Sequence, residues 1–277
     1  MSQITLPSLY GIIGYPLGHS MSPLLHTTAF RDLGIPAVLL PWSTPPEKLA
    51  TFVESMRLLN IKGCCVTIPH KQTVIPFLDE VTDRVKAIGA ANLIYWDGDK
   101  LCGDNTDVLG FMAPLEENPA APELKKVLLL GAGGAARAAV VGLQTLGYTD
   151  ITVTDIAADL PVTLAKEFNL QVVDWDKRGS VEADIVINST PLGMQGKFES
   201  QTAYDTEWFK GKKGLAYDIV YTPFMTRFRQ EAEAAGWRSV SGRDMFIAQA
   251  DAQFKTWTGQ GLSAGAKQVV IDTLAEK

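Results

Sequence analysis

The chain has 277 residues, of which 46% are hydrophobic and 20% charged, and its formal net charge is −6. This length allows one large domain or two medium ones with proper cores. The acidic balance and the lack of a basic cluster argue against a nucleic-acid partner. No apolar run approaches the ~20 residues of a membrane span, so we expect no membrane association.

The cysteine and histidine content of the chain indicates its cellular compartment and whether it has a metal site. Three cysteines, of which Cys64 and Cys65 are adjacent, make a poor disulfide framework. The N-terminus shows no basic region followed by an apolar core, so the sequence predicts a cytoplasmic protein. Three histidines without metal-ligand spacing predict no metal site.

The first hundred residues alternate between short apolar strands and helices, which predicts an α/β unit. The segment 91–102 is expected to form a hairpin around Asp97-Gly98. The expected strands are 10–14, 37–41 and 63–68, and the expected helices are 23–33 and 46–59.

Residues 115–124, rich in Pro, Glu and Ala, are typical of a surface connection, and a second α/β unit begins after them. Its expected strands are 127–130, 151–154, 171–173, 185–188 and 215–218, followed by a helix over 224–235. Two last helices, 243–257 and 264–274, have no strand after them, so we expect them to return to the first domain. The sequence therefore predicts an α/β protein with two domains. We expect residues 1–107, completed by 242–277, to form the first domain, which the family resemblance described below implies to be substrate-binding, and residues 108–241 to form a Rossmann-type dinucleotide-binding domain.

The segment 127–137 carries the dinucleotide signal. Four apolar residues precede Gly131, Gly133 and Gly134, and a helix of small residues follows. Gly131 allows a sharp turn, and Gly133 lets the backbone approach a pyrophosphate at the helix N-terminus. An ordinary strand-to-helix turn could show the same glycines. Asp155, at the end of the next strand, could accept hydrogen bonds from an unphosphorylated ribose, so the sequence predicts NAD in preference to NADP.

Four polar positions follow predicted strands or lie on the last helices. Ser20 and Ser22 could bind a carboxylate, although Ser22 could equally be a helix N-cap. Lys71 follows Pro69 and could be a solvated charge. The loop 103–107 holds two carboxylates and could be only a turn, and Gln249 could be a surface residue.

Taken together, these motifs resemble the shikimate dehydrogenase family nearly end to end. The matching stretches are 18–23, 66–71, 91–92, 103–107, 131–137, 188–194, 217–221 and 242–249. The resemblance implies an oxidoreductase that interconverts 3-dehydroshikimate and shikimate in aromatic amino acid biosynthesis, with its active site in an interdomain cleft. Lys71 and Asp107 would be the catalytic residues, the lysine carrying the proton and the aspartate orienting it and the hydroxyl group. The implied substrate-binding residues are Ser20, Ser22, Thr67, Asn92, Tyr221 and Gln249, and the implied cofactor-binding residues are Gly131, Ala132, Gly133, Gly134, Ala135, Asp155, Thr190 and Met245.

The chain also departs from the family pattern. Cys65 replaces a common Asn, and Leu93 replaces a common Thr, which weakens the prediction of the exact polyol acid. Asp155-Ile156-Ala157 stands where NADP-using members carry Asn-Arg-Thr, which favours NAD and an NAD-using branch. The alternatives are a dehydrogenase acting mainly on quinate, a non-catalytic nucleotide-binding paralogue, and a folate-linked dehydrogenase, against which the Ser20–Ser22 and 103–107 segments argue. We expect a polyol carboxylic acid as substrate and a monomer or homodimer.

Overall fold

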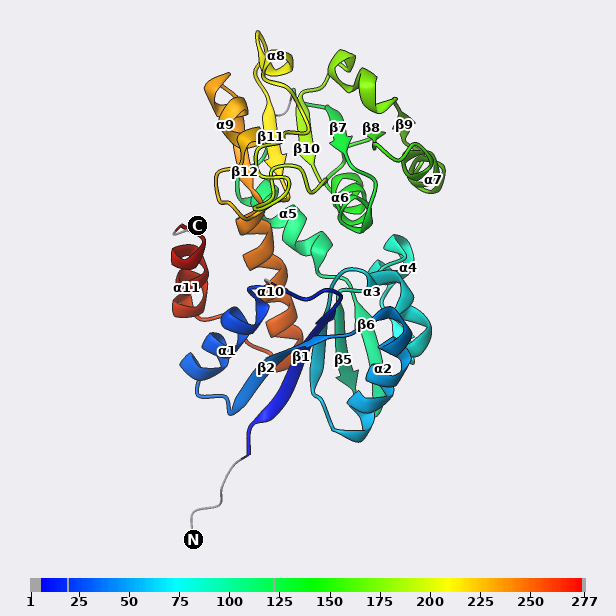
Figure 1. Cartoon of the computed structure of the whole chain (residues 1–277), viewed down its shortest axis with the longest axis vertical. Helices are drawn as coiled ribbons and strands as arrows, with labels where there is room; N and C mark the ends of the chain where they lie inside the picture. Colours follow the sequence, from blue (N-terminus) through cyan, green and yellow to red (C-terminus); the bar gives the residue numbers. More distant parts are fainter. Residues whose placement is uncertain (1–5, 19, 122, 276–277) are drawn as a thin grey trace. The chain divides into compact units, whose positions relative to one another are not determined.

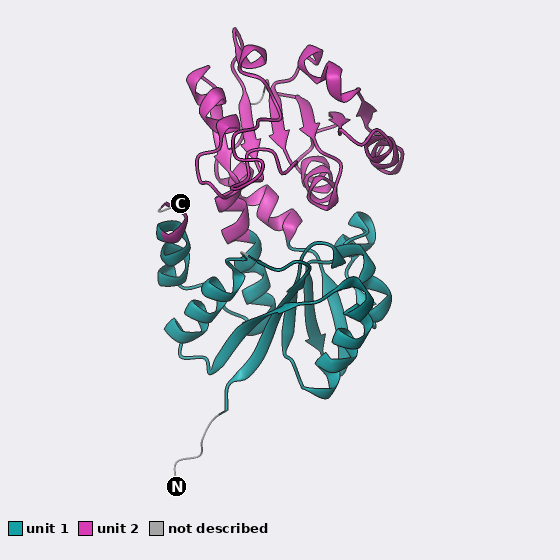
Figure 2. Cartoon of the chain, viewed as in Figure 1, with its two compact units in different colours: residues 1–106, 249–272 teal, residues 107–248, 273–277 magenta. Residues whose placement is uncertain are grey.

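The computed structural model describes residues 6–18, 20–121 and 123–275. The chain forms two compact units, residues 1–106 with 249–272 and residues 107–248 with 273–277 (Figure 2). The division between them falls inside helix α10 (Gly242–Thr258). The predicted domains and motifs also include residues 1–5, His19, Pro122 and 276–277, which lie outside the described residues. The predicted α/β fold with two domains is confirmed, whereas the functional division at residues 107 and 242 stays a prediction.

Unit 1 is built on a mixed sheet whose strand order is β2-β1-β3-β5-β6-β4. The chain passes from β1 to β2 on one side and then to β3 on the other side of β1, both in parallel. The predicted hairpin around Gly98 is confirmed, because β5 and β6 pair antiparallel. The strands are β1 (Ser8–Gly14), β2 (Ala37–Ser43), β3 (Gly63–Val66), β4 (Glu80–Val81), β5 (Leu93–Asp97) and β6 (Lys100–Asp104).

Alternating residues of β1 face two different layers of helices. Ile13 joins a core cluster with Val53 and Met56 of α2 (Leu49–Leu58). Tyr10 packs instead against Phe30 of α1 (Ser22–Asp32), with ring centroids 4.9 Å apart. Figure 1 shows α1 and α10 flanking one side of the sheet and α2 the other. The remaining helical segments of this half are η1 (Pro46–Lys48), α3 (His70–Thr73), η2 (Ile75–Phe77), α4 (Asp83–Ile88) and α11 (Ala264–Ala275).

Unit 2 holds a parallel sheet with the order β12-β11-β10-β7-β8-β9. The chain starts at β7 in the middle, moves outward to β9, and then crosses over to β10 on the other side. This is the Rossmann order, and its switch point lies between β7 and β10. The sequence analysis did not predict β12. The strands are β7 (Lys126–Leu130), β8 (Asp150–Thr154), β9 (Gln171–Val172), β10 (Ile185–Asn188), β11 (Leu215–Asp218) and β12 (Arg238–Ser241).

The helices of unit 2 cover this sheet closely. A Cβ atom at Gly142 of α6 (Gly134–Thr145) would lie 2.7 Å from the ring of Phe111, so the glycine allows α6 to approach α5 (Asp107–Glu117). Helix α5 extends through Glu117, so the predicted surface connection begins later than residue 115. The remaining helical segments are α7 (Asp159–Phe168), η3 (Trp175–Ser180), α8 (Thr206–Phe209) and α9 (Arg227–Ala234).

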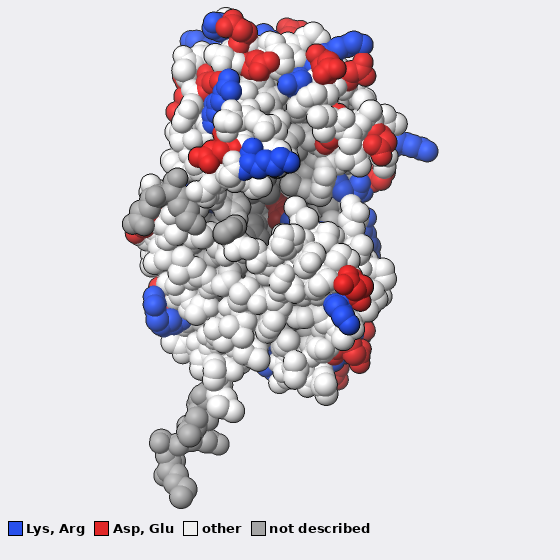
Figure 3. All heavy atoms as spheres, viewed as in Figure 1, with Lys and Arg blue, Asp and Glu red and all other residues white. Residues whose placement is uncertain are grey.

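The surface and the helices give two further observations. On the face of unit 2 shown in Figure 3, basic and acidic side chains are interspersed. Among the described residues, every helix is too short or too polar to traverse a bilayer.

Candidate active site

The predicted substrate residues of unit 1 collect at one edge of its sheet. Ser20 follows the carboxyl end of β1, and Thr67 and Lys71 follow that of β3. Strand β5 runs antiparallel, so Asn92, which precedes it, reaches the same edge, where its carbonyl accepts a hydrogen bond from Val66 N–H at 2.8 Å. The order in which the strands are added reverses between the parallel strands β1 and β3, and open α/β sheets bind ligands at such a switch point.

The two serines occupy the turn into α1. Ser22 is its first residue and is 4% exposed, while the N-cap position belongs to Met21, which makes no side-chain cap. Ser20 Oγ accepts a hydrogen bond from Ser22 N–H at 3.3 Å and is half-buried. Ser22 therefore does not occupy the N-cap position, and the Ser20 hydroxyl group is held against the Ser22 backbone.

Lys71 lies on the short helix α3, directly after the strand end that carries Thr67. Its carbonyl oxygen accepts a hydrogen bond from Ala91 N–H at 2.7 Å, and Thr67 O accepts one from His70 N–H at 2.9 Å. The neighbouring His70 is fully buried, with Nε2 2.7 Å from the Thr44 carbonyl oxygen. These contacts fix the backbone on both sides of Lys71, whose side chain is half-buried rather than fully solvated.

Two polar side chains of the loop 103–107 make hydrogen bonds that stabilise the loop itself. Asp104 is 4% exposed and accepts hydrogen bonds from Thr82 Oγ1 at 2.7 Å and from Arg84 Nε at 3.1 Å. Asn105 Nδ2 donates to the Ala90 carbonyl at 2.8 Å. Both side chains therefore hold the loop in place. Asp107, the first residue of α5, is 7% exposed and is the second carboxylate of the loop.

Asn92, Thr106 and Gln249 form a buried polar network. Asn92 Oδ1 accepts the Thr106 N–H at 2.7 Å, and Asn92 Nδ2 donates to Gln249 Oε1 at 3.4 Å. Gln249 is 8% exposed, so it is not the surface residue that one reading of the sequence allowed. Sequence reasoning missed Thr106, although the polar loop that contains it was the available signal.

Cys65, which stands where the family commonly has Asn, takes part in further hydrogen bonds that contact this network at Asn92. Cys65 Sγ donates to Gln253 Oε1 at 3.2 Å, and Gln253 Nε2 donates to the Asn92 carbonyl at 3.3 Å. Burial lowers the pKa of the neighbouring His26 to about 4. Cys65 is thus connected to the Asn92 backbone carbonyl through hydrogen bonds to and from Gln253. Leu93, the second departure, is fully buried in β5.

The glycine loop of unit 2 lies at the switch point of its sheet. Gly131 has φ +100°, and a Cβ atom there would lie 2.6 Å from Ser189 Oγ. Ser189 follows β10, and its Oγ donates to the Leu130 carbonyl at 2.8 Å. Gly133 is the N-cap of α6, and Cβ atoms at Gly133 and Gly134 would meet open space. The geometry fits a pyrophosphate, because the first amides of α6 are left with room in front of them.

Asp155 has a structural partner within this loop. Its Oδ2 accepts the Ala132 N–H at 2.8 Å, and its Oδ1 accepts the Ala157 N–H at 2.9 Å. The carboxylate ties the end of β8 to the glycine loop. Its presence at this position is therefore explained without any contact to a ribose.

Four further predicted residues lie in unit 2. Thr190 follows β10, and its Oγ1 donates to Asn188 Oδ1 at 2.6 Å. Tyr221 lies beyond the end of β11 and stacks on Phe246, with ring centroids 5.0 Å apart, and burial raises the pKa of its hydroxyl group. Met245, in the first turn of α10, is 5% exposed. Ala135, in the first turn of α6, is half-buried.

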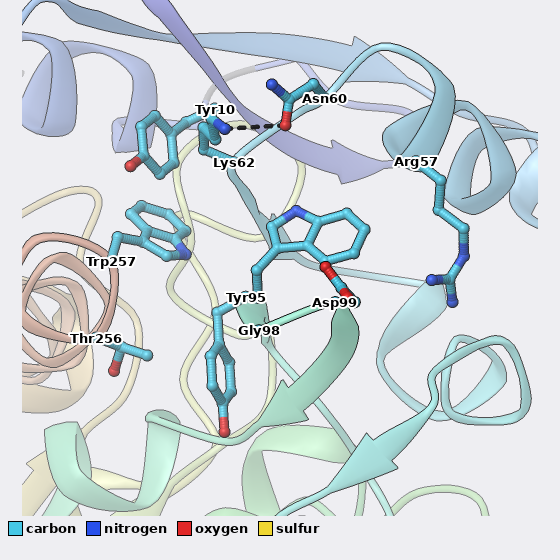
Figure 4. A pocket seen from close by; sticks show the side chains of 10 residues that line it. Tyr10, Arg57, Asn60, Lys62, Tyr95, Gly98, Asp99, Thr256 and Trp257 are labelled. Carbon is cyan, nitrogen blue, oxygen red and sulfur yellow. Dashed lines mark hydrogen bonds between the residues drawn. The ribbon is translucent and has the colours of Figure 1, made fainter.

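A cavity of about 390 Å³ lies at the other end of the unit 1 sheet (Figure 4). Tyr10 and Tyr95, which line it, pair with Gly63 at the start of β3, away from Thr67 and Lys71. None of the predicted site residues lines it. Its cations already have partners, since Arg57 pairs with Asp79 at 2.9 Å, and Lys62 donates to Asn60 Oδ1 at 2.9 Å, the dashed line in Figure 4. We therefore place the candidate site at the opposite edge.

Within the described residues, no group of three or more His, Cys, Asp or Glu side chains is arranged to hold a metal ion.

Comparisons with known proteins identify the chain's relatives. Residues 12–94 match the family model described as the shikimate dehydrogenase substrate binding domain. A protein of Pelobacter propionicus named shikimate dehydrogenase (NADP(+)) is 63% identical over 274 residues, which cover 99% of each chain. One of the same name from Oleidesulfovibrio alaskensis is 48% identical over 269 residues, covering 96% of each.

A solved structure extends the likeness to the fold. The shikimate 5-dehydrogenase of Thermus thermophilus, in complex with NADP(H) and shikimate, superimposes with a TM-score of 0.86 at 31% identity. The match covers 96% of this chain and 99% of that one.

The cofactor preference predicted from Asp155 is wrong. Four relatives that are 40–63% identical to this chain carry NADP(+) in their names, including the one that is 63% identical over nearly the whole length. The physical reason for the error is the structural use of Asp155. Both of its carboxylate oxygens accept backbone hydrogen bonds, so an acid here reports on the loop and not on the absence of a 2′-phosphate.

Proposed function

Because the chain belongs to the shikimate dehydrogenase family, we propose that it interconverts shikimate and 3-dehydroshikimate with NADP as the cofactor. One observation carries the proposal. Each unit gathers its predicted residues at the switch edge of its own sheet, hydroxyl and amide groups in unit 1 and the glycine loop in unit 2. The two clusters supply the two halves of one reaction, recognition of a polyol acid and of a dinucleotide.

Lys71 carries the proton in this proposal. Oxidation of a secondary alcohol needs a proton removed from oxygen while a hydride leaves carbon, and bound NADP supplies the hydride acceptor. A lysine side chain can act as base in one direction and as acid in the other. The role of Asp107 is to orient the hydroxyl group and the ammonium of Lys71.

The remaining unit 1 residues orient the substrate. Ser20 and Ser22 donate to its carboxylate, and the half-buried Thr67 faces its hydroxyl groups together with Asn92 and Gln249. A site built from buried polar groups rejects analogues that leave those groups unpaired. The network through Thr106 supports this selection because it fixes the Asn92 amide in one orientation.

In unit 2 the cofactor is held by the glycine loop, Thr190 and Met245. The backbone of Gly133 and Gly134 binds the pyrophosphate with the first amides of α6. The same proposal includes a cytoplasmic location, no nucleic-acid partner, and a monomer or homodimer. The three cysteines, which are buried and form no disulfide, support a reducing compartment, and the net charge of −6 disfavours nucleic acid.

The test is a direct assay of the purified protein. Shikimate and quinate are each supplied with NADP, and the absorbance of the reduced nicotinamide is followed. We expect turnover of shikimate with a kcat/KM at least tenfold above that for quinate. Saturable NADP binding without turnover of either acid would contradict the proposed activity and favour a non-catalytic nucleotide-binding protein.

A further inference from the structure

Two fully buried polar residues, Asn188 and Asp218, belong to the family-like motifs but have no role in the reaction described so far. They end the neighbouring parallel strands β10 and β11 and lie opposite each other in the register. Asn188 Nδ2 donates a hydrogen bond to Asp218 Oδ1 at 2.9 Å. The pair lies just below the edge from which the predicted cofactor residues project.

Asn188 stabilises the turn that contains Thr190. Its Oδ1 accepts hydrogen bonds from Thr190 N–H at 3.1 Å and from Thr190 Oγ1 at 2.6 Å. Its Nδ2 donates to the Leu192 carbonyl at 3.0 Å as well as to Asp218. One side chain therefore fixes both the backbone and the hydroxyl group of Thr190, and its own orientation depends on Asp218.

Asp218 stabilises the segment that leads to Tyr221. Its Oδ1 also accepts the Val220 N–H at 3.0 Å, and its Oδ2 accepts the hydroxyl group of Thr226. Thr226 is the N-cap of α9, where its Oγ1 accepts the Arg229 N–H at 3.4 Å. The carboxylate thus receives three donors from three different segments, all at the same edge of the sheet.

We propose that Asp218 and Asn188 are positioning residues, which hold the Thr190 and Tyr221 segments in register for binding of the cofactor and the substrate. The inference rests on the proposed function. Neither side chain is one of the predicted site residues, and each acts through a segment that carries one, Thr190 or Tyr221. Without Asp218, Asn188 Nδ2 and Val220 N–H lose their shared acceptor, and the Thr190 turn is free to shift. A displacement of about 1 Å at such a site costs on the order of 10²-fold in turnover.

The experiment compares three variants of the full-length protein by thermal unfolding, NADP dissociation constant and shikimate kinetics. Asp218→Ala removes the acceptor. Asp218→Asn keeps an amide oxygen for the Asn188 and Val220 donors and presents its amino group to Thr226 Oγ1. The matched control is Asp184→Ala, because Asp184 precedes β10 at the opposite end of the same sheet and its Oδ2 accepts the N–H groups of Lys125 and Lys126 at 2.9 Å each.

We expect Asp218→Ala to raise the Kd for NADP at least tenfold and to lower kcat for shikimate. Asp218→Asn should recover most of both, and Asp184→Ala should lower the melting temperature without a change in Kd. A Kd and kcat within twofold of wild type in Asp218→Ala would overturn the proposal. So would an equal loss of NADP affinity in Asp184→Ala, which would make the effect one of general stability.

Asn188→Ala keeps the proposal testable if Asp218→Ala fails to fold. It cuts the link to Thr190 while Asp218 retains Val220 and Thr226, so it should raise the Kd for NADP by a similar factor. Where both single variants fold, their effects on Kd should be strongly non-additive in the double variant, and simple additivity would contradict a shared role. Wild-type protein that binds no NADP would overturn the proposed function as well, whereas normal wild-type behaviour with silent variants overturns the positioning role alone.

Discussion

Single alanine substitutions in the glycine loop separate binding of the cofactor from stability of the fold. Gly133 has φ −80° and ψ −165°, a conformation open to alanine, and its added Cβ atom would meet no protein atom within 4 Å. Gly133→Ala should therefore leave the melting temperature unchanged or slightly raised. The methyl group nevertheless occupies the space in which phosphate oxygens would approach the α6 amides to ~2.9 Å. We expect at least a tenfold rise in the Kd for NADP.

Gly131→Ala perturbs the same loop in a different way. The positive φ costs about 1–2 kcal/mol for an alanine, and the new Cβ atom lies 2.6 Å from Ser189 Oγ. Moving that hydroxyl group gives up its hydrogen bond to Leu130, worth about 0.5–1.5 kcal/mol. The sum of about 1.5–3.5 kcal/mol corresponds to a fall in melting temperature of about 3–14 °C for a domain of this size.

The control is Gly147→Ala, which has φ +87° and no atom within 4 Å of the added Cβ atom. It carries the conformational cost alone, so its melting temperature should fall by about half as much, with no effect on NADP. Thermal unfolding and isothermal titration measure all three variants. If Gly133→Ala binds NADP as tightly as wild type, the pyrophosphate does not approach this backbone, and the account of the loop is refuted.

The remaining predictions concern pH and the network behind the site. Burial lowers the pKa of His26 to about 4, so its contribution to stability is complete above pH 6.5 and is lost as pH falls toward 4. His26→Gln should flatten that part of the stability curve by about 3 kcal/mol in denaturant titrations, and an unchanged slope would contradict it. Burial raises the pKa of Asp218 to about 7, although Thr226, Val220, Asn188 and Arg229 favour its charged form. The contribution of Asp218 to stability should therefore decline as pH rises from about 4 to 7, opposite in sign to that of His26, and Asp218→Asn should remove this decline from the wild-type curve. Cys65→Ala removes the donor to Gln253 and should raise the KM for shikimate about two- to tenfold with an unchanged Kd for NADP. A change in the NADP value instead would place Cys65 outside the substrate network.

Much of the architecture follows from local patterns. Continuous apolar runs such as Val127–Leu130 predicted the buried parallel strands within a residue or two, because both faces of such strands are covered. Two strands escaped prediction. Strand β12 reads Arg-Ser-Val-Ser, with a single apolar residue at the edge of the sheet, and β4 has only two residues. The Pro, Glu and Ala content of residues 115–124 predicted a surface connection, whereas α5 runs on to Glu117.

The site was less predictable because its contacts are tertiary. The partnership of Asn92 with Gln249 joins residues 157 positions apart, and the pairing of Asn188 with Asp218 depends on the register of two strands. Asp155 shows the opposite error. A sequence rule gave it a ribose as partner, whereas its carboxylate is used by the backbone of Ala132 and Ala157. An isolated acid after a strand cannot reveal which donors surround it.

The measurement that tests the central claim most directly is the turnover of Lys71→Ala with shikimate and NADP, set beside its Kd for NADP. If Lys71 carries the proton of the alcohol, kcat should fall by at least ~10²-fold. The Kd for NADP should stay within twofold of wild type, because Lys71 lies in unit 1 and the glycine loop in unit 2. Undiminished turnover in Lys71→Ala would contradict the account.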